Sequence, residues 1–159
     1  MKELKIEFDT KVDEEFMKEA LKEAHAAAEE DEVPIGAVIV RDGVIIARAH
    51  NKKEGSRCAT HHAEILAIQE ACEKLGGWRL PGTTLYVTLE PCPMCAGAII
   101  NSRIPRVVFG APDVRFGALG SLIDLSEYPF NHKPRVDRGI LADEAKCTLG
   151  EYFKKKRAK

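Results

Sequence analysis

The stretch Leu85-Tyr-Val-Thr-Leu-Glu-Pro-Cys-Pro-Met-Cys-Ala-Gly-Ala-Ile99 contains a strand and, immediately after it, the start of a helix. Its residue composition predicts a strand over 83–90, followed by a helix from Pro93 to about Arg103. Cys92 and Cys95 therefore lie where a strand ends and a helix begins. In open α/β sheets this carboxyl end of the strands is where ligands usually bind.

A second candidate group lies at the start of another predicted helix. Apolar residues at helical spacing mark a helix from His62 to Leu75, and Gly76-Gly77 ends it. His62 and Glu64 thus occupy the first turn of this helix. We expect this turn to lie near the pair of cysteines, because both helices start at the ligand-binding end of the sheet.

Hydrophobic patterns in the rest of the chain predict further helices and strands on both sides of these two segments. Two β-branched runs flank Asp42-Gly43, a typical hairpin signal. The order α-β-β-α-β-α-β-β-α predicts an α/β fold of three layers, α/β/α, in which helices cover both faces of a mixed five-stranded sheet. The remaining elements are helix 10–32, strands 36–40, 44–47, 106–109 and 135–141, loop 110–134 with a helical turn, and a last helix from 143 with Leu149, Tyr152 and Phe153 inward.

The length of 159 residues predicts one domain over 1–159, with an N-terminal arm at 1–12 and a basic tail at 154–159. Residues 1–32 carry 12 acidic residues and five Lys, whereas 33–159 carry 19 basic and 13 acidic residues. The basic tail permits an acidic polymer as partner, and it equally fits a solvated helix end. No apolar run approaches the ~20 residues of a membrane span, and the start resembles no secretion signal, so we expect a cytoplasmic protein with no membrane partner.

Cysteine usage points to a metal rather than to disulfides. The count of five is odd, and Cys92 and Cys95 form the one Cys-x-x-Cys pair. Together with His62 they offer zinc two thiolates and an imidazole. Three protein ligands are typical of a catalytic zinc site, where the fourth position holds a water that ionises near neutral pH. Glu64, two residues beyond the histidine, is placed to take a proton from that water and return it to a substrate.

Two other interpretations of the cysteine pair remain open on sequence grounds. A structural zinc site would need a fourth ligand, for which Cys58, His61 and His132 are candidates. A thioredoxin-like redox pair also opens a helix after a strand, but it would leave His62 and Glu64 without a role. The remaining cysteines, Cys72 and Cys147, lie among apolar helical positions and are expected to be buried thiols.

Beyond the metal residues, the chain resembles the bacterial tRNA-specific adenosine deaminase family from about Val33 to Phe153. The metal motif alone fits any zinc nucleobase deaminase, whose H-x-E and P-C-x-x-C signature it matches. The collinear run around the motif is more specific. It comprises Val33-Pro-Ile-Gly-Ala-Val-Ile-Val40, His62-Ala-Glu-Ile65, Trp78-Arg-Leu80, Leu85–Ile99, Ser102-Arg-Ile-Pro-Arg-Val-Val-Phe-Gly-Ala111, Gly120-Ser-Leu122, Asn131-His132 and Gly139-Ile-Leu-Ala-Asp-Glu144.

The resemblance implies a cytidine-deaminase-like fold and hydrolytic conversion of adenosine to inosine at the wobble position of tRNA. It implies a homodimer whose substrate is an anticodon loop, with the target base splayed into the pocket. By position, Asn51 matches the side chain that hydrogen-bonds the nucleoside, and Ala63 and Pro91 match residues lining the base pocket. Asp113 matches a loop that approaches the RNA backbone. For Asn51 and Asp113 an ordinary turn residue is the alternative.

The chain departs from the family pattern where Ala59-Thr60-His61 replaces a Pro-Thr-Ala run. That segment, with Arg115-Phe116-Gly117, is similar to the catalytic subunit of the eukaryotic heterodimeric enzyme, so a heterodimer is an alternative to the homodimer. Two other functions share the motif. One is a deaminase of free guanine, cytosine or nucleosides. The other is a non-catalytic RNA-binding subunit, against which the presence of Glu64 argues.

Overall fold

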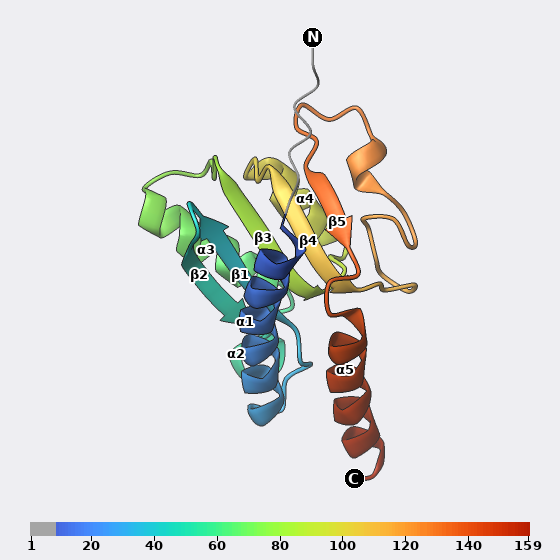
Figure 1. Ribbon diagram of the computed structural model, residues 1–159. Coiled ribbons are helices and arrows are strands. Elements are labelled where there is room, and N and C mark those ends of the chain that lie inside the picture. The colour runs from blue at the N-terminus through green and yellow to red at the C-terminus, as the bar shows by residue number, and fades with distance from the viewer. Residues whose placement is uncertain (1–8) are drawn as a thin grey trace.

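The computed structural model describes residues 9–159. Its elements follow the predicted order, with one short helix added (Figure 1). They are α1 (Thr10–Glu29), β1 (Gly36–Arg41), β2 (Val44–His50), α2 (Lys53–Ser56), α3 (Ala63–Leu75), β3 (Thr83–Leu89), α4 (Pro93–Asn101), β4 (Arg106–Ala111), the 3-10 helix η1 (Leu125–Glu127), β5 (Arg135–Arg138) and α5 (Ala142–Arg157).

The five strands form one mixed sheet in the order β2-β1-β3-β4-β5. β1 pairs antiparallel with β2 and with β3, whereas β3–β4 and β4–β5 are parallel. Asp42 and Gly43 both have positive φ, 51° and 75°, as the tight turn of the β1–β2 hairpin requires. The parallel pair β3–β4 needs a crossover, and α4 supplies it. This crossover places the start of α4 at the carboxyl end of β3.

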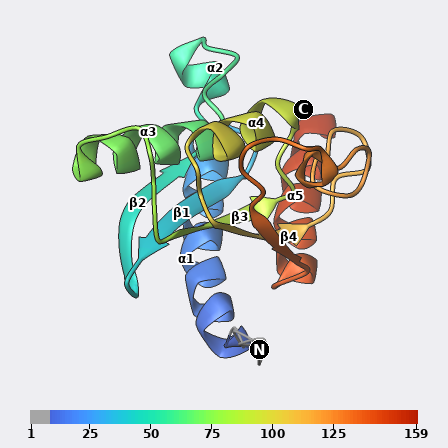
Figure 2. The same ribbon diagram turned by 90° about the horizontal axis from the view of Figure 1, so that it is seen from above.

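Helices cover both faces of the sheet, which confirms the predicted three-layer α/β/α fold. α1 and α5 lie on one face, and α3 and α4 lie on the other (Figures 1 and 2). The larger core lies under α3 and α4 and includes Leu85, Ile99 and Phe109. The core under α1 joins Met17 to Val38 and Val108. Each such fully buried side chain contributes about 1.5–3 kcal/mol to folding.

Several sequence predictions need correction. The first helix ends at Glu29 rather than Glu32, and the short helix α2 lies in a segment for which no element was predicted. Phe153 is 43% exposed although its neighbour Tyr152 is buried, because the two side chains lie on different sides of α5. Of the two thiols predicted to be buried, Cys147 is exposed and Cys72 is only half-buried. The predicted N-terminal arm lies mainly outside the described residues, and residues 10–12 belong to α1. The basic tail at 154–159 forms the last turn of α5 and the chain end.

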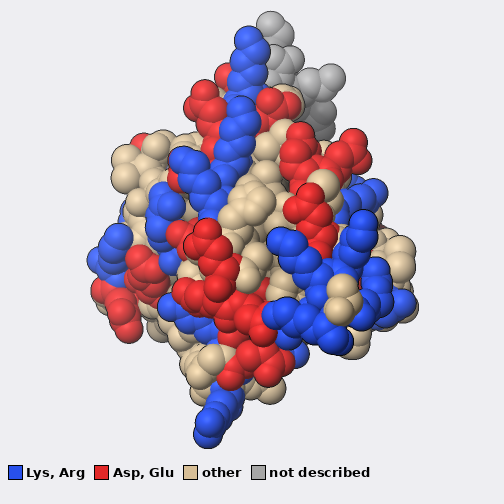
Figure 3. Space-filling model, turned by 90° about the horizontal axis from the view of Figure 1, so that it is seen from below, with Lys and Arg blue, Asp and Glu red and all other residues tan. Residues whose placement is uncertain are grey.

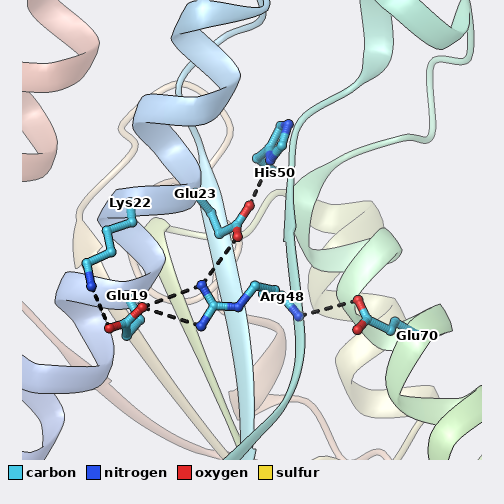
Figure 4. Close-up of polar contacts among 6 residues, drawn as sticks. All are labelled: Glu19, Lys22, Glu23, Arg48, His50 and Glu70. Carbon is cyan, nitrogen blue, oxygen red and sulfur yellow. Dashed lines mark hydrogen bonds and ion pairs between the residues drawn. The ribbon is translucent and has the colours of Figure 1, made fainter.

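An ionic network fastens the edge strand β2 to the helices on either side of it (Figure 4). The Arg48 guanidinium lies 3.4 Å from Glu19 and 3.5 Å from Glu23, both on α1, and the Arg48 backbone N–H donates to Glu70 on α3. His50 Nδ1 lies 2.8 Å from Glu23, and its Nε2 lies 3.0 Å from Glu30. These charged groups cover an edge strand that would otherwise be open to pairing with another chain.

Between residues 9 and 159, none of the helices combines the length and the apolar composition that crossing a bilayer requires.

Candidate active site

Two helices begin at the same end of the sheet and direct their first residues toward each other. His62 is the N-cap residue of α3, and Cys92 is the N-cap residue of α4. Neither side chain caps its own helix, so each can contribute to a shared site. Cys95 lies one turn further along α4 and is fully buried. The structure therefore brings together the three residues that the sequence nominated as metal ligands.

The dimensions of this cluster suit zinc. His62 Nδ1 lies 3.6 Å from Cys92 Sγ and 3.5 Å from Cys95 Sγ. Zinc–sulfur bonds of about 2.3 Å and zinc–nitrogen bonds of about 2.0–2.1 Å, meeting at a tetrahedral angle, separate sulfur from nitrogen by about 3.6 Å. The residues present thus fit the ion. Among residues 9–159, no other group of three His, Cys, Asp or Glu side chains has its donor atoms within such reach of one another.

The electrostatics of the cluster favour a cation. A hydrogen bond from Cys95, with another from His62, lowers the pKa of the Cys92 thiol to about 4, although burial opposes its ionisation. Donating that bond, together with burial, raises the pKa of Cys95. The hydrogen bond to Cys92 also raises the pKa of His62. Because a cation bound by these donors displaces the shared protons, metal binding is expected to release protons.

Glu64 lies beside the cluster in the first turn of α3 and is 4% exposed. Burial raises the pKa of its carboxyl group above the ordinary 4.5, and the charge on Cys92 adds to the rise. A carboxyl group whose pKa is moved toward neutrality can both accept and return a proton during a reaction. Glu64 also lines the adjoining cavity, so it can reach a substrate held there.

The cluster lies beside a cavity of about 500 Å³, large enough for a nucleobase and its sugar. A second hollow of about 560 Å³ continues the first toward α5 and shares Lys53, His62 and Phe116 with it. The inner part is lined by Ile35, Lys53, Ala59, His62, Glu64, Leu89, Glu90, Cys92, Pro93, Met94, Asp113 and Phe116. The two hollows form one cleft that extends from the cluster to the surface of α5.

Asn51 follows β2 directly and is 6% exposed on the wall of the outer hollow. Its Oδ1 accepts a hydrogen bond of 2.8 Å from the backbone N–H of Ala63, which ties it to the start of α3. That contact leaves the two donors of the Asn51 amide nitrogen for a ligand. Ala63 and Pro91 are buried beside lining residues but do not themselves line the cleft.

Asp113 lines both hollows and holds a turn. Its Oδ1 accepts hydrogen bonds from the backbone N–H groups of Arg115 and Phe116, at 3.0 and 3.2 Å. This is the ordinary turn role that the sequence left open for an aspartate in Ala-Pro-Asp. The turn presents Phe116, which is 64% exposed, to the cleft.

The cleft residues that the sequence analysis missed include Lys53, Glu90 and Phe116. Lys53 begins the unpredicted helix α2, and Phe116 lies in a loop whose path no periodic pattern reveals. Glu90 did carry a signal, because an acidic residue at the end of a buried strand and directly before Pro91-Cys92 requires a partner.

The side chains considered as a fourth zinc ligand are engaged elsewhere. His61 Nδ1 lies 2.6 Å from the Ser56 hydroxyl, and His132 Nε2 lies 2.6 Å from the carbonyl oxygen of Ile104. Cys58 Sγ lies 3.3 Å from the Thr60 hydroxyl. Among the described residues the cluster therefore offers three donor side chains, the number typical of a catalytic rather than a structural zinc site. The five cysteines, all within the described residues, form no disulfide.

Comparisons with known proteins agree with this geometry. The sequence model of the MafB19-like deaminase family matches residues 11–157. The tRNA-specific adenosine deaminase of Bacillus subtilis (strain 168) is 55% identical over 92% of this chain and 92% of its own length. This chain belongs to the tRNA-specific adenosine deaminase family. As a member of that family it is a deaminase, and the resemblance stated from sequence is confirmed.

Solved structures extend this relationship within the tRNA-specific adenosine deaminase family and beyond it. A structure from a study of tRNA:A34 deaminases is 49% identical, with a TM-score of 0.81, and covers 85% of this chain and 99% of that chain. The guanine deaminase of Nitrosomonas europaea is 30% identical, with a TM-score of 0.74, and the match covers 87% of this chain and 83% of the guanine deaminase. The fold is thus shared by enzymes with different substrates, so the substrate must be argued from the cleft.

Proposed function

We propose that this chain is a zinc-dependent enzyme that converts adenosine to inosine at the wobble position of tRNA. The observation that carries the proposal is the cluster of His62, Cys92 and Cys95 with buried Glu64 at the inner end of an open cleft. Similarity to tRNA-specific adenosine deaminases over most of the chain supports the choice of substrate. The last turn of α5 carries Lys154, Lys155, Lys156 and Arg157, and it forms a basic region beside an acidic one on the face drawn in Figure 3. Because Lys156 also lines the outer hollow, this basic region supports a polyanionic partner.

The chemistry divides between the metal and the protein. Zinc, when bound by the three ligands, supplies an activated water as nucleophile near neutral pH. Glu64 accepts a proton from the attacking water and delivers protons to the adenine ring nitrogen and then to the departing amine. The net reaction consumes one water and releases one ammonia. Because Glu64 is buried, bulk water does not compete with it for these protons.

The substrate is positioned by residues around this centre. We assign to the Asn51 amide nitrogen a hydrogen bond to the nucleoside, since its Oδ1 is held by Ala63. Ala63 and Pro91 shape the base pocket by fixing the starts of α3 and α4. Asp113, at the rim, approaches the RNA backbone through the turn that it holds. A splayed base of an anticodon loop can enter such a cleft, whereas a base stacked within a duplex cannot.

Free guanine is the second candidate substrate, because the guanine deaminase of Nitrosomonas europaea has the same fold at 30% identity. The outer hollow argues for the larger substrate. It has a volume of about 560 Å³, and its lining includes Lys53 and Lys156, which a free base would not need, beside the acidic Glu32 and Glu54. Lys156 also pairs with Asp31 at 3.2 Å on the surface. Phosphate groups flanking the target nucleotide would be attracted to these two amines.

The decisive experiment incubates the zinc-loaded protein with an anticodon stem-loop that carries adenosine at the wobble position. Nucleoside analysis is expected to show inosine. The Glu64→Ala variant should retain one zinc per chain and lose activity by a factor of about 10²–10⁴ or more. Glu73→Ala, which removes an exposed carboxylate from the same helix, is the matched control and should react normally.

Two outcomes would contradict the proposal. Inosine formation by Glu64→Ala at the rate of the unmodified protein would remove Glu64 from the proton transfers. Release of ammonia from free guanine, without inosine in the stem-loop, would assign the chain to the second candidate function. In both assays zinc content is measured in parallel, so that loss of metal is not mistaken for loss of chemistry.

We also propose that the protein works as a cytoplasmic homodimer, as the family resemblance implies. Apolar side chains exposed on the 110–134 loop support a partner surface: Leu122 is 57% exposed, Tyr128 51% and Phe130 47%. The rings of Tyr128 and Phe130 lie 6.1 Å apart, and large apolar side chains exposed together commonly mark a protein interface. Light scattering of the purified chain tests the dimer, and a monomer at micromolar concentration would contradict it.

A further inference from the structure

Glu90 is a buried acidic residue of the cleft for which the proposed chemistry has no use. It follows β3, is 2% exposed and lines the inner cavity. Its Oε1 accepts hydrogen bonds from the Asp113 backbone N–H, at 3.2 Å, and from the Ser121 hydroxyl. Its Oε2 accepts from the backbone N–H groups of Leu119 and Ser121, both at 3.1 Å. All four donors belong to one loop, residues 113–121.

These contacts occupy both oxygens of Glu90 and leave it no role as a base toward substrate. A carboxylate satisfied by three backbone N–H groups and a hydroxyl instead stabilises the conformation of the loop that supplies them. The loop contains no helix or long strand of its own, so these bonds replace the regular backbone pairing that it lacks. Burial strengthens them, because water does not compete.

The loop packs closely against Glu90 and the residue that follows it. A Cβ atom at Gly117 would collide with Glu90 Oε2 and with the carbonyl oxygen of Asp113. The Ala118 N–H donates to the carbonyl oxygen of Pro91, at 2.9 Å, so the residue after Glu90 also holds the loop. The loop is therefore docked on the same short segment that carries Cys92. Its position relative to the metal ligands is set by this contact.

The docked loop forms one wall of the cleft. Asp113 and Phe116 line both hollows together with Lys53 of α2, and the aromatic ring of Phe116 is exposed there. An aromatic ring at the mouth of a nucleobase pocket can stack on a base or exclude water from it. Whether the Phe116 ring can do either depends on the position in which the loop holds it.

We propose that Glu90 is a positioning residue that docks loop 113–121 beside the metal ligands and so places Phe116 and Asp113 to receive the substrate. The inference rests on the proposed function for its substrate, but the docking contact stands on the hydrogen bonds alone. Glu90 acts through the loop, so its loss should weaken substrate binding much more than the chemical step.

The test is the Glu90→Gln variant, which keeps the size of the side chain and turns an amide N–H₂ toward backbone N–H donors. With the wobble-adenosine stem-loop, we expect KM to rise about tenfold or more, as the loss of a charge-assisted hydrogen bond implies, with kcat within about threefold. Zinc content should be unchanged. Glu127→Gln, the same substitution at an exposed position in the 110–134 segment, is the control and should leave both constants unchanged.

A second readout does not depend on turnover. In hydrogen exchange followed by NMR, the amides of Leu119 and Ser121 should be protected in the unmodified protein and exchange about tenfold faster or more in Glu90→Gln. If the unmodified protein made no inosine, the proposed function would fail while this measurement still decided the docking role. If Glu90→Gln does not fold, Gly117→Ala displaces the loop with Glu90 intact and should produce the same rise in KM.

Three results would overturn the proposal. Unchanged KM together with unchanged amide exchange would show that the loop does not depend on Glu90. A fall in kcat at unchanged KM would place Glu90 in the chemistry. Loss of zinc from folded Glu90→Gln would make it a support of the metal ligands rather than of the substrate wall.

Discussion

Replacing Asp13 by asparagine tests the buried ion pair that joins α1 to the sheet. Asp13 lies in the first turn of α1 with its side chain 7% exposed. Its carboxylate accepts hydrogen bonds of 2.9 and 2.7 Å from the Arg106 guanidinium and one of 2.7 Å from the Tyr86 hydroxyl. Three elements, α1, β3 and β4, therefore meet at one carboxylate.

The expected cost follows from these contacts. Removing one partner of a buried ion pair costs about 3–5 kcal/mol, because the other charge stays buried. Here Arg106 keeps its ion pair with Asp137 at 2.9 Å, and the asparagine carbonyl oxygen can still accept one hydrogen bond. We therefore expect Asp13→Asn to lower the free energy of unfolding by about 3 kcal/mol, the low end of that range. For a chain of this length that corresponds to a fall in Tm of about 6–12 °C.

The effect of Asp13→Asn on stability should depend on pH, because the pKa of Asp13 differs between the folded and unfolded states. Burial alone would raise the pKa of Asp13, but hydrogen bonds from Arg106 and Tyr86 outweigh it and hold the pKa below its ordinary 3.8. A group whose pKa is lower in the folded state stabilises the fold above its unfolded pKa, and that stability is lost as the pH falls through the folded pKa. The Tm difference between the two proteins should thus be full above about pH 5 and shrink below pH 3.8.

Differential scanning calorimetry from pH 3 to pH 7 measures this difference. Glu15→Gln, which removes an exposed acidic charge from the same end of α1, should shift Tm by less than about 2 °C. An Asp13→Asn shift no larger than that of Glu15→Gln, or a difference that grew on acidification, would refute the reasoning.

Three further predictions concern the site. His62→Ala should lose the zinc measured by atomic emission, whereas the neighbouring His61→Ala should keep it; equal zinc in both would refute the ligand assignment. Glu32 is 2% exposed and accepts hydrogen bonds from the backbone N–H groups of Glu54 and Gly55, so Glu32→Gln should speed hydrogen exchange of those amides by about tenfold; unchanged exchange would contradict this. Finally, the affinity for the stem-loop should fall as salt rises from 50 to 200 mM, because phosphate contacts release counterions, and a flat salt profile in fluorescence anisotropy would exclude the basic end of α5 as a contact surface.

Local signals in the sequence were sufficient for the main elements of the fold. Helical spacing of apolar residues marked helices such as α3, because that order along the chain reflects which face is buried. Composition and β-branched runs, rather than alternation, marked the central strands, which are buried on both faces. The turn at Asp42-Gly43 could also be predicted, because its backbone conformation with positive φ is favoured by those two residues themselves. α2 was missed because its four residues are all exposed and show no period.

Burial at the ends of elements depended on packing that local patterns do not contain. Cys147 and Phe153 are exposed although Ala145, Thr148 and Tyr152 of the same helix are buried, because the two side chains lie on the solvent side of α5. Asp13 and Arg106 show the opposite case. In the sequence each resembles an ordinary charged surface residue. The two residues are 93 positions apart, and the hydrogen-bonded ion pair between them offsets the free-energy cost of burying both charges.

The sequence by itself determined which residues are candidates for the reactive groups: a histidine and two cysteines with the spacing of zinc ligands, and a glutamate two residues beyond the histidine. This motif can be recognised in the sequence because the types of the ligand residues, and the helix starts on which they lie, are local properties of the chain. The tertiary structure alone decided that His62 lies 3.5–3.6 Å from both sulfurs. It alone revealed the cleft walls formed by Lys53 and Phe116 and the contact of Glu90 with loop 113–121. These features join residues more than 20 positions apart, and their distances follow from how helices pack on a sheet rather than from any pattern along the chain.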